Sequence, residues 1–420
     1  MRLSTTMMYS NGLSGVLSQE SDMNRLVEQV GSGRKFLTPA DDPLSASLSI
    51  GVAQTKSMNS TYGLNRDTAM TNLGQESNVL DSITTALQDV RTRVIQAGNG
   101  TFADSDRQAL STALKSARDA LLGLANSTDG NGQYLFSGYQ GGVVPYSQDT
   151  NGKIVYSGAT GERTIQVDQS RQLSTSDLGI DVFSRANPGS QAYVSTAANA
   201  NTGTAQFSTV SVTPGSANIG KNFQIQFEAD PATGNMGYRV TTTDPNANPP
   251  VPPVVTPTPP AAPTQYTEGA AIDFGGVSVV VKGTPANGDV IDVQSVQTAD
   301  LDMFTTLDSL IKVLDSPIAG DEVALAKLNN ELATANKKLS NNYDNVLTVA
   351  ASVGARMNEL EALDATGTKK GLTYSKTLSD LEDLDYFAGA SQLAMRKVAL
   401  EAASSAFMTI QGSSLFSRGK

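Results

Sequence analysis

The distribution of proline divides this chain into helix-compatible ends and a different middle. Of 17 prolines, none lies between residues 1 and 38, between 44 and 144, or after Pro317. Proline interrupts a helix because it lacks an amide hydrogen and its ring clashes with the preceding turn. The pattern predicts an α+β fold: a long up-and-down helical bundle built from both chain ends, with an inserted mainly β head domain.

Both extremities carry an apolar residue every seven positions. A C-terminal helix is predicted from Ser379, which has the capping-box partner Glu382, and the N-terminal helix is predicted to end near Gly31 to Gly33. Beside the C-terminal repeat runs a second apolar line, and such a helix needs a partner surface from its own chain or from another copy. The repeats are Tyr9, Val16, Met23 and Val30, then Tyr386, Leu393, Leu400 and Phe407, with Met395, Val398 and Ala402 on the second line.

Caps mark the helices that follow the N-terminal one. Asp42 and Pro43 suit the start of a long helix that continues to about Ala97. Ser105 and Gln108 form another capping box ahead of a third helix. Short turns between these helices are typical of an up-and-down bundle.

Helical spacing returns near the C-terminal side of the chain. It begins at Leu301, is interrupted by Pro317 and continues to Leu360. Gly367 and Gly371 are expected to bracket a loop before the terminal helix.

Between the helical ends, the apolar period becomes that of short strands separated by Gly, Asn and Asp turns. The segments are YLFSG (134–138), KIVYSG (153–158), RTIQV (163–167), FQIQFEAD (223–230), MGYRVTTT (236–243) and the two strands expected within 274–296. Residues 244–263 hold nine prolines and are expected to form an extended, mobile loop that does not pair in a sheet.

Five domains follow from these boundaries. They are an N-terminal assembly helix and turn (1–42), the N-terminal half of a helical stem (43–139), a mainly β head with its proline-rich loop (140–297), the C-terminal half of the stem (298–370) and a C-terminal assembly helix (371–420).

Composition excludes several classes of function. The net charge of −11 disfavours nucleic acid as a partner, since no basic patch is present to contact phosphates. The absence of Cys and His removes thiolate nucleophiles, imidazole bases and the usual zinc sites. The sequence contains no run of about eighteen apolar residues, so no membrane-spanning helix is expected. The N-terminus also lacks the continuous apolar core of a secretory signal.

No segment predicts catalysis or a cofactor. GSANIGKN (215–222) has the spacing of a phosphate-binding loop, but Asn222 replaces the Ser or Thr and a strand-like segment follows. The clusters at Asp129 and Asp149 lack the Glu of a calcium loop and are expected to be turns. The acidic run 380–385 suits a helix start. We therefore expect a non-enzymatic protein with no cofactor and no metal.

The two ends resemble a known family. The matching segments are RLSTTMMY (2–9), QVGSGRKFLTPADDP (29–43), GQYLFSG (132–138), VGARMNELE (353–361) and LEDLDYFAGASQLAMRKVALEAASSAFMTIQGSSLF (381–416). They are similar to the hook-associated protein 3 family, the hook–filament junction proteins of the bacterial flagellum, which resemble flagellin at both ends. The final GSSLF is more like this family than like flagellin. The resemblance covers roughly the first 140 and last 120 residues and leaves out the head.

The resemblance implies a structural axial protein at the hook–filament junction, outside the cell. Its partners would be neighbouring copies in a helical ring, the preceding hook-associated protein and flagellin. It would be exported unfolded through the flagellar type III apparatus, with its C-terminal helix held beforehand by a cytoplasmic chaperone. Head-to-tail contacts of this kind build tubes instead of closed dimers, and the terminal helices would order only on joining their neighbours.

The resemblance also implies subunit-interface residues, for which packing inside the chain's own core is the alternative. These residues are Leu3, Met8, Leu13, Val16, Leu393, Leu400, Phe407, Ile410, Leu415 and Phe416. Flagellin itself remains an alternative function. Two further alternatives are a cytoplasmic coiled-coil regulator, which would not need a β head, and a secreted hydrolase, which would need a carboxylate pair in a pocket.

Overall fold

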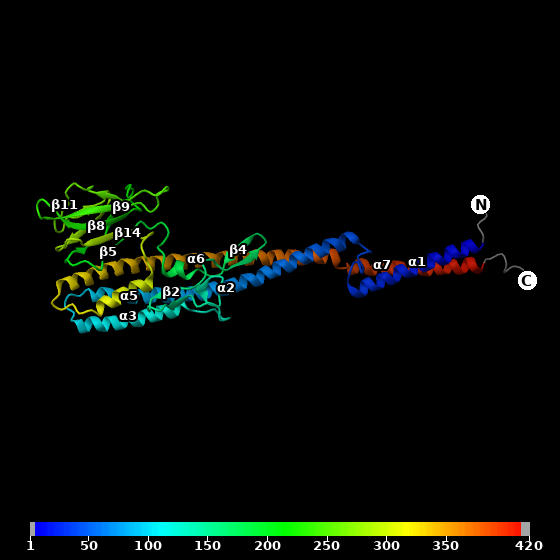
Figure 1. The fold of residues 1–420 in the computed structure, drawn as a ribbon. Helices are drawn as coiled ribbons and strands as arrows, with labels where there is room; N and C mark the ends of the chain where they lie inside the picture. Colours follow the sequence, from blue (N-terminus) through cyan, green and yellow to red (C-terminus); the bar gives the residue numbers. More distant parts are fainter. Residues whose placement is uncertain (1–4, 413–420) are drawn as a thin grey trace, which may run out of the picture. The chain divides into compact units, whose positions relative to one another are not determined.

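The computed structural model describes residues 5–412 (Figure 1). Two compact units are present: a terminal unit formed by residues up to 66, 167–170 and from 361 onward, and a central unit formed by 67–166 and 171–360. Helices from both chain ends flank a strand-rich middle, which confirms the predicted α+β class. The bounds of the five predicted domains stay predictions.

Two complete helices and parts of two others form the terminal unit. Helices α1 (Thr5–Ser32) and α7 (Tyr386–Gly412) lie side by side (Figure 1). The start of α2 (Pro43–Ala97) and the end of α6 (Glu322–Glu382) complete the unit. As predicted, α1 ends where Gly33 takes a φ of +71°, and Asp42 caps α2 by accepting a hydrogen bond from Ser45 N at 3.0 Å.

The loop predicted at Gly367 and Gly371 is wrong, because α6 is helical through both glycines. Gly367 is a point of close approach between helices. Its carbonyl oxygen accepts a hydrogen bond from Asn59 Nδ2 of α2 at 2.9 Å, and a Cβ at this position would collide with the guanidinium of Arg66. Packing against α2 therefore outweighs the helix-breaking tendency of glycine, which is only about 1 kcal/mol per residue.

The start predicted for the C-terminal helix is also wrong. Ser379 and Glu382 lie in the last turn of α6, and residues 383–385 form a non-helical segment before α7. Asp385 caps α7, since its Oδ1 accepts hydrogen bonds from the amides of Phe387 at 3.0 Å and Ala388 at 3.2 Å.

Four helices pack together in the central unit: the rest of α2, α3 (Asp104–Ala125), α5 (Met303–Leu314) and the first part of α6. Helix α3 begins one residue before the predicted cap Ser105, and Asp106 accepts a hydrogen bond from Ala103 N at 3.0 Å. The helix core contains the apolar positions that the sequence spacing predicts. They include Leu80, Ile83, Leu87, Val90, Val94, Leu114, Leu121, Phe304, Leu307, Leu328, Leu332, Leu339, Val346, Val353 and Leu360, all buried.

Short elements cover one part of these helices. They are a 3-10 turn η1 (Leu135–Ser137), the hairpins β1 (Tyr146–Gln148) with β2 (Ile154–Tyr156) and β3 (Thr164–Asp168) with β4 (Arg171–Ser174), and α4 (Gly179–Phe183). The strand predicted at YLFSG is wrong, because Leu135 and Phe136 form the turn and are buried. Phe136 joins an aromatic layer in which the Tyr146 ring lies 5.1 Å from that of Phe304 and the Phe183 ring 5.7 Å from it.

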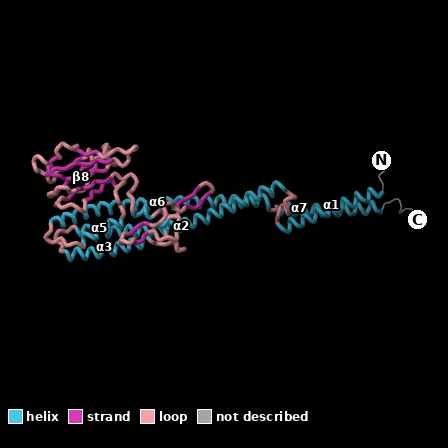
Figure 2. The backbone as a smooth tube through the Cα atoms, viewed as in Figure 1, coloured by secondary structure: helices cyan, strands magenta, loops and turns pink. Residues whose placement is uncertain are grey.

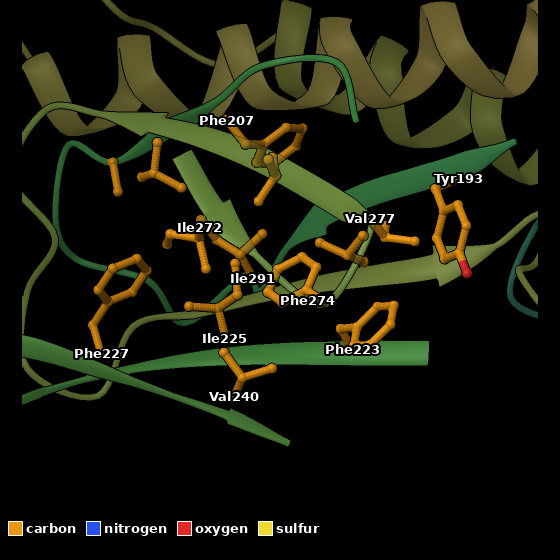
Figure 3. Packing of buried hydrophobic residues seen from close by; sticks show 14 residues of the cluster. Tyr193, Phe207, Phe223, Ile225, Phe227, Val240, Ile272, Phe274, Val277 and Ile291 are labelled. Atoms are coloured by element: carbon orange, nitrogen blue, oxygen red, sulfur yellow. The ribbon is translucent and has the colours of Figure 1, made fainter. Parts of the chain in front are cut away.

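Two antiparallel sheets face each other in the rest of the middle (Figure 2). The strands are β5 (Tyr193–Ala197), β6 (Gln206–Phe207), β7 (Ser211–Val212), β8 (Asn222–Ala229), β9 (Met236–Thr243), β10 (Val254–Thr256), β11 (Thr264–Gln265), β12 (Ala271–Asp273), β13 (Val277–Lys282) and β14 (Val290–Ser295). One sheet has the order β10-β9-β8-β14-β5 with β11 on β9, and the other has the order β12-β13-β6 with β7 on β13. Alternate residues of both sheets form the core between them, including Phe223, Ile225, Phe227 and Val277 (Figure 3).

The proline-rich segment corrects one expectation. Val254, Val255 and Thr256 form the short strand β10, which pairs with β9, so the segment does pair in a sheet. This is possible because the three residues between the prolines keep their amide hydrogens, and because β10 is an edge strand, where proline is tolerated.

Helix α6 holds the sandwich through side chains that bind backbone atoms. Asn330 donates to the carbonyl of Ala205 at 2.8 Å and accepts from the amide of Phe207 at 3.2 Å, at the β6 edge. Thr334 donates to the carbonyl of Ser195 at 2.7 Å, at the β5 edge. One helix therefore satisfies edge strands of both sheets.

Candidate assembly surface

Helices α1 and α7 pack closely against each other. The Tyr9 ring lies 5.2 Å from the Phe407 ring, and a Cβ at Gly12 would come within 2.9 Å of Phe407. Glycine at position 12 thus lets the phenyl ring approach the α1 backbone. Farther along, Arg396 of α7 pairs with Asp22 of α1 at 3.0 Å. The pair is a close helix–helix contact with an ion pair at its margin.

Backbone hydrogen bonds fix the place where the chain enters and leaves this pair. The amide of Lys35 donates to the carbonyl of Glu382 at 2.7 Å, and the amide of Leu384 donates to the carbonyl of Gly33 at 2.8 Å. A side chain at Gly33 would be both strained by the positive φ and only 2.8 Å from the Tyr386 hydroxyl. The turn after α1 and the break before α7 are therefore joined.

The turn between α1 and α2 is held by carboxylates. Asp41 accepts hydrogen bonds from the amides of Thr38 at 2.8 Å and Leu37 at 3.1 Å, and these bonds lower the pKa of Asp41 from its ordinary value. The Ser45 hydroxyl and amide similarly lower the pKa of Asp42. Both side chains are therefore negatively charged at neutral pH and stabilise the turn in that form.

A buried arginine joins the hairpin tip to the helices of the terminal unit. Arg66 is 4% exposed; its Nη1 donates to the carbonyl of Val167 at 3.0 Å, and its Nε donates to Asp364 at 3.2 Å. Lys370 pairs with Asp168 at 3.1 Å beside it. The sequence reasoning did not identify this cluster, because Arg66 is isolated in the sequence and its partners lie about 100 and 300 residues away.

The described interface candidates keep part of their surface exposed. Leu13 is 38% exposed, and Val16, Leu393, Leu400 and Phe407 are half-buried. Leu393 and Leu400 share the helix face of Phe407 by their seven-residue spacing, so this line faces α1. Leu3, Leu415 and Phe416 lie outside the described residues, as do the side chains of Met8 and Ile410.

The second apolar line of α7 is the more exposed one. Met395 is 67% exposed, Val398 is 64% exposed and Ala402 is also exposed. Phe387, at the start of the helix, is 93% exposed. The i, i+3, i+7 spacing of 395, 398 and 402 was visible in the sequence, yet the predicted interface used only the other line. Helix α7 is therefore apolar on two faces, and α1 covers one of them.

The terminal unit has almost no hydrophobic core of its own. Among its described residues, the buried hydrophobic side chains are only Leu26, Ala46 and Val167. Exposed large side chains are numerous by contrast, with Leu17 at 55% and Val27 at 50% on α1. A helix pair in water gains most of its stability from packing of apolar faces. This unit therefore has apolar surface available for further partners.

The segments whose sequences resemble calcium or phosphate loops do not form such loops in the structure. Asp129 Oδ1 accepts hydrogen bonds from the amides of Asn131 at 2.8 Å and Gln133 at 2.9 Å, and Asp149 does the same with the amides two and four residues on. Asn222 begins strand β8. Within residues 5–412, no cluster of three acidic side chains has the geometry of a metal site, and no helix has the length and hydropathy of a bilayer span.

Comparison with known proteins agrees with this architecture. The family model described as the bacterial flagellin N-terminal helical region matches residues 3–141. Flagellar hook-associated protein 3 of Salmonella typhimurium is 29% identical over 416 residues, which is 99% of this chain and 99% of that protein. The crystal structure of flagellar hook-associated protein 3 from Legionella pneumophila superposes with a TM-score of 0.66 at 29% identity, covering 79% of this chain and 98% of that one. The chain therefore resembles hook-associated protein 3 along 99% of its sequence and shares its fold.

The likeness to hook-associated protein 3 extends beyond the two ends. The Salmonella protein aligns along 99% of this chain, so the likeness includes the proline-bearing middle that the sequence resemblance left out. A second Legionella pneumophila structure, of the flagellar junction protein FlgL, superposes with a TM-score of 0.62 at 28% identity and covers 80% of this chain and all of that one. Helical ends and β head are thus shared as one arrangement of elements.

Proposed function

We propose that this chain is the structural subunit that joins the flagellar hook, through the preceding hook-associated protein, to the flagellin filament. The full-length likeness to hook-associated protein 3 supports this role over that of flagellin. The single observation that carries the mechanism is the open apolar line on α7. We infer a non-enzymatic role, because the relatives are structural proteins of the flagellum.

Neighbouring copies would cover this line by coiled-coil packing. Burying the exposed part of Met395 or of Val398 contributes about 1–2 kcal/mol each, scaled from about 1.5–3 kcal/mol for full burial of such a side chain. Leu13, Val16, Leu393, Leu400 and Phe407 would contribute through the parts that α1 and α7 leave exposed. Head-to-tail contacts along a screw axis generate a ring or tube, in which each copy covers the next.

The proposal extends to the export of the chain from the cell. The chain would pass unfolded through the flagellar type III apparatus, and a cytoplasmic chaperone would shield α7 until then. The support is the same apolar surface, because a helix with an uncovered apolar face is prone to aggregation in the cytoplasm. The final location would be outside the cell at the hook–filament junction.

Genetic complementation tests the proposal. Val398→Asp is introduced into the chromosomal copy, with Val254→Asp as the matched control, because Val254 on β10 is similarly exposed at 55%. The α7 variant should be secreted and melt like the wild type, while its filaments detach; the β10 variant should keep them. Normal filament attachment by Val398→Asp contradicts the proposed interface.

Localisation separates the junction role from that of flagellin. Immunogold labelling should place this chain at the filament base only. Labelling along the whole filament would assign it to the filament itself.

A further inference from the structure

A cleft of about 320 Å³ lies in the central unit, where the open side of the sandwich meets the helices. Strand β5, strand β6 with the residues after it, and helix α6 form its walls, and Arg91 reaches it from α2. This volume is at the lower end of the range that small-molecule sites occupy, about 300–1,000 Å³.

Two cations without acidic partners face this cleft. Arg91 and Lys337 both line it, and neither forms an ion pair with any carboxylate of the described chain. None of the lining residues is Asp or Glu. In a chain with 41 acidic and 30 basic residues, a cleft of purely positive charge selects for an anion. Arg91 is also positioned by Tyr343, whose ring centre lies 5.6 Å from the guanidinium carbon.

Two hydrogen-bonding atoms at the cleft have no partner in the chain. Ser195 is 5% exposed, and its Oγ forms no hydrogen bond, although its carbonyl is held by Thr334. The Nε of Arg91 is buried and likewise without a partner. Buried polar groups are almost always hydrogen-bonded, so these two atoms are available to bond a polar ligand at the cleft.

The cleft also has an apolar side. Tyr193 and Phe207 line it from the two sheets but belong to the sandwich core, with exposed fractions of 1% and 8%; Figure 3 shows Phe207 beneath the helices at the edge of that core. The amide of Asn336 and further hydroxyls stand beside these rings. The hydroxyl and amide groups of this lining suit a ligand that carries hydroxyl groups in addition to its negative charge.

We propose that this cleft binds a sugar acid of about monosaccharide size, whose carboxylate pairs with Arg91 and Lys337. The sugar hydroxyls bond to Ser195 and Asn336. Charge-assisted hydrogen bonds from arginine to a carboxylate provide most of the affinity, and the hydroxyl contacts provide selectivity.

Titration of the purified full-length chain with glucuronate, followed by calorimetry, tests this assignment. Glucose is the matched neutral sugar and inorganic phosphate the matched small anion. Glucuronate should bind saturably, and both comparison ligands should bind at least about tenfold more weakly, a difference of about 1.4 kcal/mol. Arg91→Gln and Lys337→Gln should each weaken glucuronate binding by about tenfold or more, whereas Lys312→Gln, on the exposed face of α5, should leave it unchanged.

Each alternative result overturns the assignment. Absence of saturable binding removes the site, and equal binding of glucose removes the role of the two cations. Equal binding of phosphate leaves a general anion site without sugar recognition. If Arg91→Gln melts at a lower temperature than the wild type, Arg91→Lys and Lys337→Gln provide the comparison. Glucuronate binding that survives Lys337→Gln in a folded protein refutes the proposal.

Discussion

A buried carboxyl group in the central unit makes the stability of the protein depend on pH. Glu76 of α2 is fully buried; its Oε1 accepts a hydrogen bond from Asp177 N at 2.9 Å, and its Oε2 has no partner. Asp177 is itself paired with Arg356 of α6. Burial, reinforced by the negative charge of Asp177, raises the pKa of Glu76 from 4.5 to about 8.

The sign of the effect follows from proton binding. Between pH 4.5 and about 8 the unfolded chain loses the proton that the folded chain keeps. The free energy of unfolding therefore falls as the pH rises through this window, by up to about 1.4 kcal/mol per pH unit. Glu76→Gln preserves the shape of the neutral acid and removes the ionisation. At pH 7 the variant should be more stable than the wild type by up to about 3 kcal/mol.

Urea unfolding at pH 5, 6, 7 and 8, followed by circular dichroism, measures this difference. The advantage of Glu76→Gln should grow steadily with pH, while Glu361→Gln, which changes an exposed carboxylate, should show no such trend. An advantage that is the same at pH 5 and pH 8 would refute the reasoning, since the folded chain would then not be retaining the proton.

Further predictions concern the contacts that hold each unit. Arg66→Leu should speed hydrogen exchange of the amides at 167–170, because the Val167 carbonyl loses its donor, and unchanged exchange would show that the hairpin tip is held otherwise. Asn342→Ala should lower the free energy of unfolding by about 1–3 kcal/mol, because its amide satisfies the Leu301 carbonyl at 2.9 Å. Asn341→Ala, whose amide bonds only within α6, should cost less in the same urea titration, and equal losses would contradict this assignment. Asp42→Ala should cost about 1 kcal/mol in thermal unfolding through loss of the α2 cap, and no loss would show that Pro43 alone fixes the helix start.

The sequence predicted those features that depend on local chemistry. The absence of proline from long segments indicated the helices, and Asp42 and Gly33 act where a cap and a left-handed residue were expected. Alternation in 223–230 and 236–243 likewise predicted β8 and β9, because one face of each strand must enter a core. Such signals are contained within a few residues.

Features that depend on distant contacts were not predictable in this way. Gly367 predicted a loop, but it lies inside a helix. Arg66 and Asn59 of another helix approach it so closely that a side chain would not fit. The roles of Asn330 and Asn342 on α6 could not be predicted from apolar spacing, because both side chains are polar. They donate hydrogen bonds to carbonyl groups on other elements. Deciding which helix face meets which neighbour requires the tertiary arrangement.

For the assembly surface, spacing alone identified two apolar lines on the last helix. It could not tell which line α1 would cover, because both have the period that a helix partner needs. The structure places Phe407 against Tyr9 and leaves Val398 open. The proposed interface therefore includes residues that the predicted set omitted.

The hydrogen bonds that attach the β sandwich to α6 limit which residues of the sandwich must be kept. Asn330 and Thr334 bind the carbonyl oxygens of Ala205 and Ser195, which every amino acid has, and the amide of Phe207, which every amino acid except proline has. Substitutions on the outward surface of the inserted domain therefore leave its hydrogen bonds to α6 intact. The exterior of the domain can therefore change without loss of these bonds, as long as Asn330 and Thr334 of α6 are kept.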